Sequence, residues 1–174
     1  MNGRIRVERG DITRIPVDAV VNAANSALAG GGGVDGAIHR AGGASLMQEL
    51  NVIREREGGC PTGSAVVTGA GKLPAKFVFH AVGPVYRDGR HGEPALLASC
   101  YGTCLKLAVK HGARTISFPA ISTGVYGYPV GLAAEIAVRE VTGFLQENTP
   151  IDAVIFVVFD AGAEKAYTRL LGGK

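Results

Sequence analysis

The residues of this chain that could do chemistry are concentrated in one segment near the amino end. It contains the asparagines Asn22 and Asn25, four consecutive glycines at 30–33 and the carboxylate of Asp35. Four glycines in a row do little to stabilise a fold, because glycine loses more backbone entropy on folding than any other residue. Their use is to let backbone N–H groups approach a ligand closely, and N–H groups attract anions. The segment therefore predicts an anion-binding loop beside a carboxylate and two neutral amides.

This segment lies between a buried strand predicted over residues 17–22 and a helix predicted from Val34. In α/β sheets, ligands bind at the carboxyl ends of the strands. Asp35 would lie in the first helical turn, where the helix dipole stabilises a carboxylate by roughly 0.3–1 kcal/mol. That is a sufficient structural role for Asp35, but a carboxylate held in its ionised form beside a ligand can also act as a general base.

A second loop repeats this arrangement. A strand predicted at 115–118 is followed by small and hydroxyl-bearing residues, and a helix begins near Val130. The amino ends of the two helices, each carrying about half a positive charge, could then converge above the sheet. Because neither loop contains a lysine, an anion would be held by backbone amides. One loop could hold a single phosphate, so two loops facing one ligand predict a diphosphate.

The predicted elements that position both loops alternate between strands and helices. Strands are predicted at residues 4–9, 17–22, 64–68, 76–82, 115–118 and 153–159, and helices at 34–56, 93–110, 130–146 and 163–171. A kink or break is expected in the first helix at Gly42-Gly43. The central strands are continuous apolar runs, which is typical of strands covered by helices on both faces. We therefore expect an α/β fold, a three-layer α/β/α sandwich with a central mixed, largely parallel sheet, formed by one domain over residues 1–174.

The composition argues against several classes of function. The net charge of +3, from 18 basic and 15 acidic residues, suits an anionic ligand, but the basic residues are scattered and give no strong nucleic-acid signal. The three cysteines cannot form a complete disulfide framework, and the four histidines are too widely spaced to predict a metal site. Neither a basic-then-apolar leader nor an apolar run of about 18 residues occurs, so we expect a cytoplasmic protein without membrane contact. No metal and no cofactor are expected.

One motif points in a different direction. Residues 31–36 satisfy the G-x-G-x-x-G fingerprint of dinucleotide-binding folds. That fingerprint requires a tight turn from strand to helix, whereas here the Asn22-Ala-Ala-Asn25 segment separates the strand from the glycines. No second βαβ half with a ribose-binding acid follows. A nicotinamide-dependent oxidoreductase is therefore the weaker alternative.

Four motifs, in order along the chain, strongly resemble those of macro domains. They are Gly10-Asp-Ile-Thr13, Asn22-Ala-Ala-Asn25, the run from Gly31 to Gly42, and Ile121-Ser-Thr-Gly-Val-Tyr-Gly-Tyr-Pro129. More narrowly, they resemble the MacroD-type ADP-ribosyl hydrolases, which include the bacterial O-acetyl-ADP-ribose deacetylases. The resemblance covers essentially the whole chain. It implies a macro domain fold, ADP-ribose and its esters as ligands, and metal-free ester hydrolysis with water.

The resemblance implies roles at the adenine end of ADP-ribose. Asp11 would accept a hydrogen bond from the adenine amino group, Ile12 would contact the ring, and Phe159 would lie beside it. Without the resemblance, Asp11 is a turn aspartate that bonds its own backbone, and Phe159 is a core residue at the end of a strand.

The resemblance also implies roles at the reacting end. The asparagine that matches Asn25 binds the ribose nearest the scissile bond, and Asp35 would activate water, or a substrate hydroxyl that positions water, for attack on an ester. His39, one helical turn beyond Asp35, would have an accessory catalytic role. For Asn22, support of the loop backbone is as good an interpretation as ligand contact. The remaining predicted ligand-binding residues belong to the two loops: Gly31, Gly32, Gly33, Val34, Ser122, Thr123, Gly124, Val125 and Tyr126.

Two macro domain functions stay open beside the oxidoreductase. The first is an enzyme that hydrolyses the ester joining ADP-ribose to an acetyl group or to an acidic protein side chain. The second is a module that reads ADP-ribose without turnover, although macro domains that only read tend to lack the Asn25 and Asp35 pair. The enzyme is the favoured interpretation. Its partners would be ADP-ribose esters, including mono-ADP-ribosylated proteins.

Overall fold

The sheet that carries the site is mixed and largely parallel. The structure, a computed structural model, describes residues 3–147 and 149–172. Across these residues six strands form one sheet in the order β1-β6-β5-β2-β4-β3. They are β1 (Ile5–Arg9), β2 (Ala19–Ala24), β3 (Ala65–Gly69), β4 (Phe77–Val82), β5 (Thr115–Phe118) and β6 (Ala153–Val158). Neighbouring strands run parallel except β3, which is antiparallel to β4.

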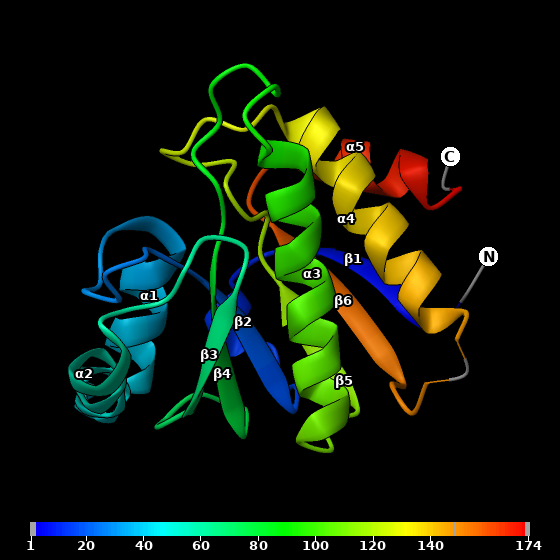
Figure 1. Ribbon diagram of the computed structural model, residues 1–174. Helices are drawn as coiled ribbons and strands as arrows, with labels where there is room; N and C mark the ends of the chain where they lie inside the picture. Colours follow the sequence, from blue (N-terminus) through cyan, green and yellow to red (C-terminus); the bar gives the residue numbers. More distant parts are fainter. Residues whose placement is uncertain (1–2, 148, 173–174) are drawn as a thin grey trace.

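Helices cover both faces of this sheet, which confirms the predicted three-layer sandwich (Figure 1). The helices are α1 (Gly33–Gly42), α2 (Ala44–Glu57), α3 (Glu93–Lys110), α4 (Val130–Leu145) and α5 (Ala161–Leu170), with a short 3-10 helix η1 (Ile12–Arg14) after β1. Helices α3, α4 and α5 pack against one another on one face, and α1 and α2 lie on the other. None of the described helices is both long enough and apolar enough to span a bilayer.

The two faces have different cores. Beneath α3 and α5, a row of aromatic rings fills the larger one, with centroids 4.9 Å apart for Tyr101–Phe118 and again for Phe156–Tyr167. The smaller core buries Ile38 of α1 completely against strands β2 and β4. All three cysteines are buried free thiols. Because the strands are buried on both faces, they read as continuous apolar runs.

The structure refines three predicted elements. The helix predicted over 34–56 is two helices, because Gly43 adopts a φ of 91°, in the left-handed region that favours glycine. Strand β2 begins and ends two residues later than predicted, so Asn22 lies inside the strand and is fully buried. Helix α5 starts two residues early, because the carboxylate of Asp160 accepts the N–H of Ala163 at 2.8 Å and caps the helix.

The topology brings distant loops together at one edge of the sheet. Strands β2, β4, β5 and β6 run parallel to one another, so their carboxyl ends lie at the same edge. Both glycine-rich loops follow such ends. The first loop, residues 25–32, comes after β2, and the second loop, residues 119–129, comes after β5. The edge expected from the sequence therefore carries both of them.

Candidate functional site

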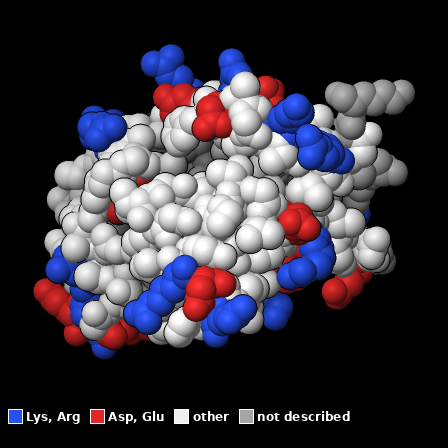
Figure 2. Space-filling view, turned by 90° about the horizontal axis from the view of Figure 1, so that it is seen from above, with Lys and Arg blue, Asp and Glu red and all other residues white. Residues whose placement is uncertain are grey.

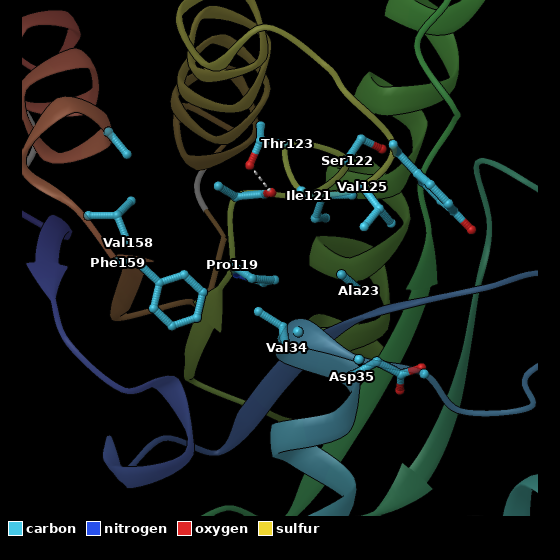
Figure 3. Close-up of a pocket in the computed structure, with 18 of the residues that line it drawn as sticks. Ala23, Val34, Asp35, Pro119, Ile121, Ser122, Thr123, Val125, Val158 and Phe159 are labelled. Carbon is cyan, nitrogen blue, oxygen red and sulfur yellow. Dashed lines mark hydrogen bonds between the residues drawn. The ribbon is translucent and has the colours of Figure 1, made fainter.

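The two loops enclose a cavity of about 480 Å³, a size suited to a nucleotide-sized ligand. Its lining residues come from the ends of four strands and from the starts of three helices (Figure 3). They are Ala23, Ala24, Asn25, residues 31–35, Gly83, residues 119–126, Val130, residues 157–160 and Ala163. This lining contains no lysine or arginine. Figure 2 shows the same face, with most charged side chains around its margin.

Asn25 holds the first loop in shape. Its Nδ2 donates to the carbonyl of Gly30 at 2.9 Å, and its Oδ1 accepts from the N–H of Ala29 at 3.1 Å. The loop then passes along the cavity, where the N–H groups of Gly32, Gly33 and Val34 donate to no acceptor in the described part of the chain. Helix α1 begins at Gly33, so these groups add to the positive end of its dipole.

The second loop presents a matching set of donors. The N–H groups of Gly124, Val125 and Tyr126 likewise find no acceptor within residues 3–147 and 149–172. The loop is held by the Thr123 hydroxyl, which donates to the carbonyl of Ala120 at 2.7 Å (Figure 3). Ser122 adopts a φ of 68°, and its carbonyl accepts the N–H of Tyr128 at 2.9 Å. Partnerless N–H groups from two loops thus face one cavity without cations, an arrangement that suits a diphosphate.

Asp35 is the buried carboxylate at the cavity. Its Oδ1 accepts from Asn22 Nδ2 at 2.8 Å, and His39 Nε2 lies 3.3 Å from the same oxygen. Its Oδ2 lies on the other side, toward the first loop: a Cβ on Gly31 would be 3.5 Å from this oxygen and 3.9 Å from Asn25 Nδ2. Asp35 and Asn25 therefore flank the same stretch of the glycine loop. A carboxylate oxygen so placed can accept a proton from a bound water.

Four predicted site residues do not line the cavity. Asn22 lies in β2 behind Asp35, and His39 lies on the next turn of α1. Ile12 is buried in the smaller core. Asp11 is exposed, and hydrogen bonds from the hydroxyl and the N–H of Thr13 lower the pKa of its carboxyl.

The turn that carries Asp11 nevertheless adjoins the far end of the cavity. The N–H of Gly10 donates to the carbonyl of Val158 at 3.0 Å, which fixes the turn beside the end of β6. Phe159 follows there and is 69% exposed. An exposed aromatic ring next to an apolar strand end offers a stacking surface for a flat ligand group. Adenine contact by Asp11, Ile12 and Phe159 stays a prediction.

The buried carboxylate of Glu93, which is not among the predicted site residues, supports the second loop indirectly. Its Oε2 accepts the N–H groups of Arg87, Asp88 and Gly89, and its Oε1 accepts that of His91. Residues 83–92 are thereby folded around it. Asp88, His91 and Glu93 carry atoms that could bind a metal ion, and these atoms all lie within 4.8 Å of one another. Both Glu93 oxygens, however, already accept N–H groups.

This folded segment packs against the second loop at Gly83 and at Tyr86. The N–H of Tyr86 donates to the carbonyl of Tyr126 at 2.8 Å. The centroid of the Tyr86 ring lies 4.7 Å from that of the Tyr128 ring. Tyr128 is buried, so its ring packs against Tyr86 rather than facing the solvent. The signal that could have revealed Glu93 is its place at the first turn of a helix after a loop rich in glycine.

Glu93 should make the stability of the protein sensitive to acid. Burial alone would raise the pKa of Glu93, but the N–H groups of Arg87, His91 and Gly89 outweigh it and lower the pKa from 4.5 to about 2. A carboxyl whose pKa is lower in the folded state stabilises the fold above its unfolded value and loses this effect as pH falls through the folded one. We expect wild type to exceed Glu93→Gln in free energy of unfolding at neutral pH, with the difference shrinking between about pH 4.5 and 2.

Urea unfolding at several pH values measures this difference. The exposed Glu55→Gln serves as a control for the loss of one charge and should show no such narrowing. A constant gap between wild type and Glu93→Gln from neutral pH down to about pH 2 would contradict the role assigned to Glu93.

Known proteins are similar to this chain in sequence and in fold. The family model described as Macro domain matches residues 21–137. An O-acetyl-ADP-ribose deacetylase of Escherichia fergusonii is 53% identical over 98% of this chain and 97% of its own. A macro domain-containing protein of Caldanaerobacter subterraneus is 54% identical, with 97% and 96% of the two chains covered.

Solved structures of macrodomains are also similar to this chain in fold. The Oceanobacillus iheyensis macrodomain with ADP has a TM-score of 0.89 and 41% identity, and the match covers 95% of this chain and 88% of that one. The Trypanosoma brucei macrodomain in complex with ADP-ribose has a TM-score of 0.89 and 43% identity, and the match covers 97% of this chain and 69% of that one.

Proposed function

Because the chain belongs to the macro domain family, we propose that it binds ADP-ribose in the cavity and hydrolyses esters of ADP-ribose. O-acetyl-ADP-ribose is the first substrate to consider, since several relatives more than 50% identical are named for its deacetylation. The observation that carries the proposal is the position of Asp35 Oδ2. It lies beside Asn25, at one end of a cavity whose two loops offer unpaired N–H groups.

ADP-ribose would lie along the cavity with its two ends recognised differently. The N–H groups of the two loops would surround the diphosphate, with Ser122, Thr123 and Tyr126 shaping the second loop. Phe159 would lie beside adenine, with Asp11 and Ile12 near it. Asn25 uses one amide hydrogen on Gly30, so its second hydrogen is available for a ribose hydroxyl.

The chemistry follows from the carboxylate at the ribose end. Asp35 Oδ2 would take a proton from a water, directly or through a substrate hydroxyl that positions it, while the water oxygen bonds to the ester carbonyl carbon. The bond from that carbon to the ribose oxygen then breaks, and the proton passes to the departing oxygen. The products are ADP-ribose and a carboxylic acid. His39 would support this step by its contact with Asp35 Oδ1.

The same reaction serves any carboxylic ester at this position. The proposal therefore includes mono-ADP-ribose esters of acidic protein side chains as substrates. A cytoplasmic location is a further part of the proposal. A panel of O-acetyl-ADP-ribose, a mono-ADP-ribosylated glutamate peptide and an ADP-ribosylated nucleic-acid end, assayed by release of ADP-ribose, ranks these substrates. We expect turnover of the acetyl ester. Tight binding of ADP-ribose with no release from any substrate would instead identify a reader module.

A further inference from the structure

A row of buried polar side chains crosses the sheet behind Asp35. Thr68 of β3, His80 of β4 and Asn22 of β2 are 2%, 0% and 0% exposed. Asn22 and His80 are paired across β2 and β4, and Thr68 lies diagonal to His80 on β3. Polar groups in a sheet that is otherwise apolar destabilise the fold unless they are hydrogen-bonded. The row therefore needs an explanation other than packing.

The directions of the hydrogen bonds along this row follow from one donor. The single hydroxyl hydrogen of Thr68 is donated to the carbonyl of Gly69 at 2.8 Å. Thr68 must then accept from His80 Nε2, at 2.9 Å, which places the imidazole proton on Nε2. His80 Nδ1 is left to accept from Asn22 Nδ2, at 3.1 Å. Burial, together with the nearby His39, lowers the pKa of His80 to about 3, so the ring stays neutral.

Asn22 connects this row to the carboxylate. Its other amide hydrogen is donated to Asp35 Oδ1 at 2.8 Å. Its own carbonyl oxygen is buried and meets no donor among the residues described. The flipped amide would turn that oxygen toward two acceptors, Asp35 Oδ1 and His80 Nδ1, in place of two hydrogen bonds. The fold thus leaves a carbonyl unsatisfied while an N–H is presented to Asp35.

We propose that Thr68 and His80 are positioning residues: they fix the amide of Asn22, and through it the orientation of the Asp35 carboxylate. The inference rests on the proposed function, in which Asp35 Oδ2 receives a proton. Holding Oδ1 from behind leaves Oδ2 on the side of Gly31 and Asn25. The ionisable groups that face the row are Asp35 and His39 from α1 and Glu49 from α2, which accepts the N–H of Gly69.

Thr68→Val is the sharpest test, because it keeps the size of a residue that does not touch the cavity. Without the hydroxyl, His80 loses the partner that fixes its tautomer, and Asn22 can turn away from Asp35. We expect kcat for O-acetyl-ADP-ribose to fall about tenfold or more, with KM and the Kd for ADP-ribose within about twofold of wild type. Thr68→Ser, which restores the hydroxyl, should recover most of kcat.

Ser117→Ala is the matched control. Ser117 carries a fully buried strand hydroxyl on β5 that has no hydrogen-bond partner in the described part of the chain. Its removal should leave kcat unchanged. An unchanged kcat in Thr68→Val, or equal losses in kcat and ADP-ribose affinity, would overturn the positioning role.

A spectroscopic measurement tests the geometry without relying on turnover. NMR of protein labelled with 15N in histidine should show His80 protonated on Nε2 from about pH 5 to about pH 8, and this signature should weaken in Thr68→Val. A proton on Nδ1 in wild type would overturn the proposal. Absence of turnover in wild type would contradict the proposed function instead, which separates the two failures.

Discussion

Asp35→Ala should lower kcat for O-acetyl-ADP-ribose by about 10²- to 10⁴-fold while ADP-ribose still binds. The loss is large because Asp35 is the carboxylate beside Asn25, and removing it leaves the attacking water without a base. Binding should persist because the diphosphate would be bound by backbone N–H groups that the substitution leaves in place. Asp35→Asn, which keeps the shape but cannot take a proton, should lose nearly as much.

Release of ADP-ribose measures the first quantity and calorimetric titration with ADP-ribose the second. Asp152→Ala is a suitable control, because Asp152 precedes β6 at the opposite edge of the sheet and pairs there with Arg114. It should turn over substrate at the wild-type rate. If Asp35→Asn keeps more than about a tenth of the wild-type kcat, general-base catalysis by Asp35 is wrong.

Gly83→Ala should weaken ADP-ribose binding by about 10- to 100-fold, because the new methyl group has no room. A Cβ at Gly83 would lie 2.2 Å from Ser122 Oγ and 2.6 Å from Ile121 Cγ2. The second loop would have to move away, and Ser122, already at a φ of 68°, is the residue displaced first. Gly83 itself has no positive φ, so the effect is one of space rather than of backbone strain.

Calorimetry with ADP-ribose, together with the midpoint of thermal unfolding, separates loss of binding from loss of fold. Gly143→Ala provides the matched control, since a Cβ there meets nothing within 4 Å. Gly143 is inside α4, so alanine should stabilise the protein by about 0.5–1 kcal/mol and leave affinity unchanged. An affinity within about twofold of wild type in Gly83→Ala would show that the loop accommodates the methyl group.

The fold was predictable because its signals are local and mutually consistent. Helix α3 and strand β5 have the predicted boundaries, since glycine caps the helix and the strand is a short apolar run. The break at Gly43 was expected from the glycine pair. The two-residue shift of β2 was not, because Asn22 is a polar residue inside a strand, and its hydrogen bonds come from parts of the chain far away in sequence.

The position of the cavity was predictable for a similar reason. The residues of the two loops line the cavity, as the motifs implied, because loops at the carboxyl ends of parallel strands face the same edge. The supporting residues were missed. The spacing of the histidines argues only against a metal site, whereas the place of His80 in an otherwise apolar strand is a sign of a buried polar contact. Gly83 and Glu93 act through three-dimensional contacts that no spacing along the chain encodes.

Because the donors of the cavity belong to the main chain, the site should tolerate sequence drift unevenly. Short of proline, no substitution at Val125, whose side chain is fully exposed, deletes its peptide N–H. A library of single variants should therefore show broad tolerance at Val125 and sharp intolerance at Gly83, where the shape of the loop depends on the absence of a side chain. Under the proposed function, the path of the backbone would determine recognition of the diphosphate, and exposed side chains such as that of Val125 would be free to vary around a fixed ligand.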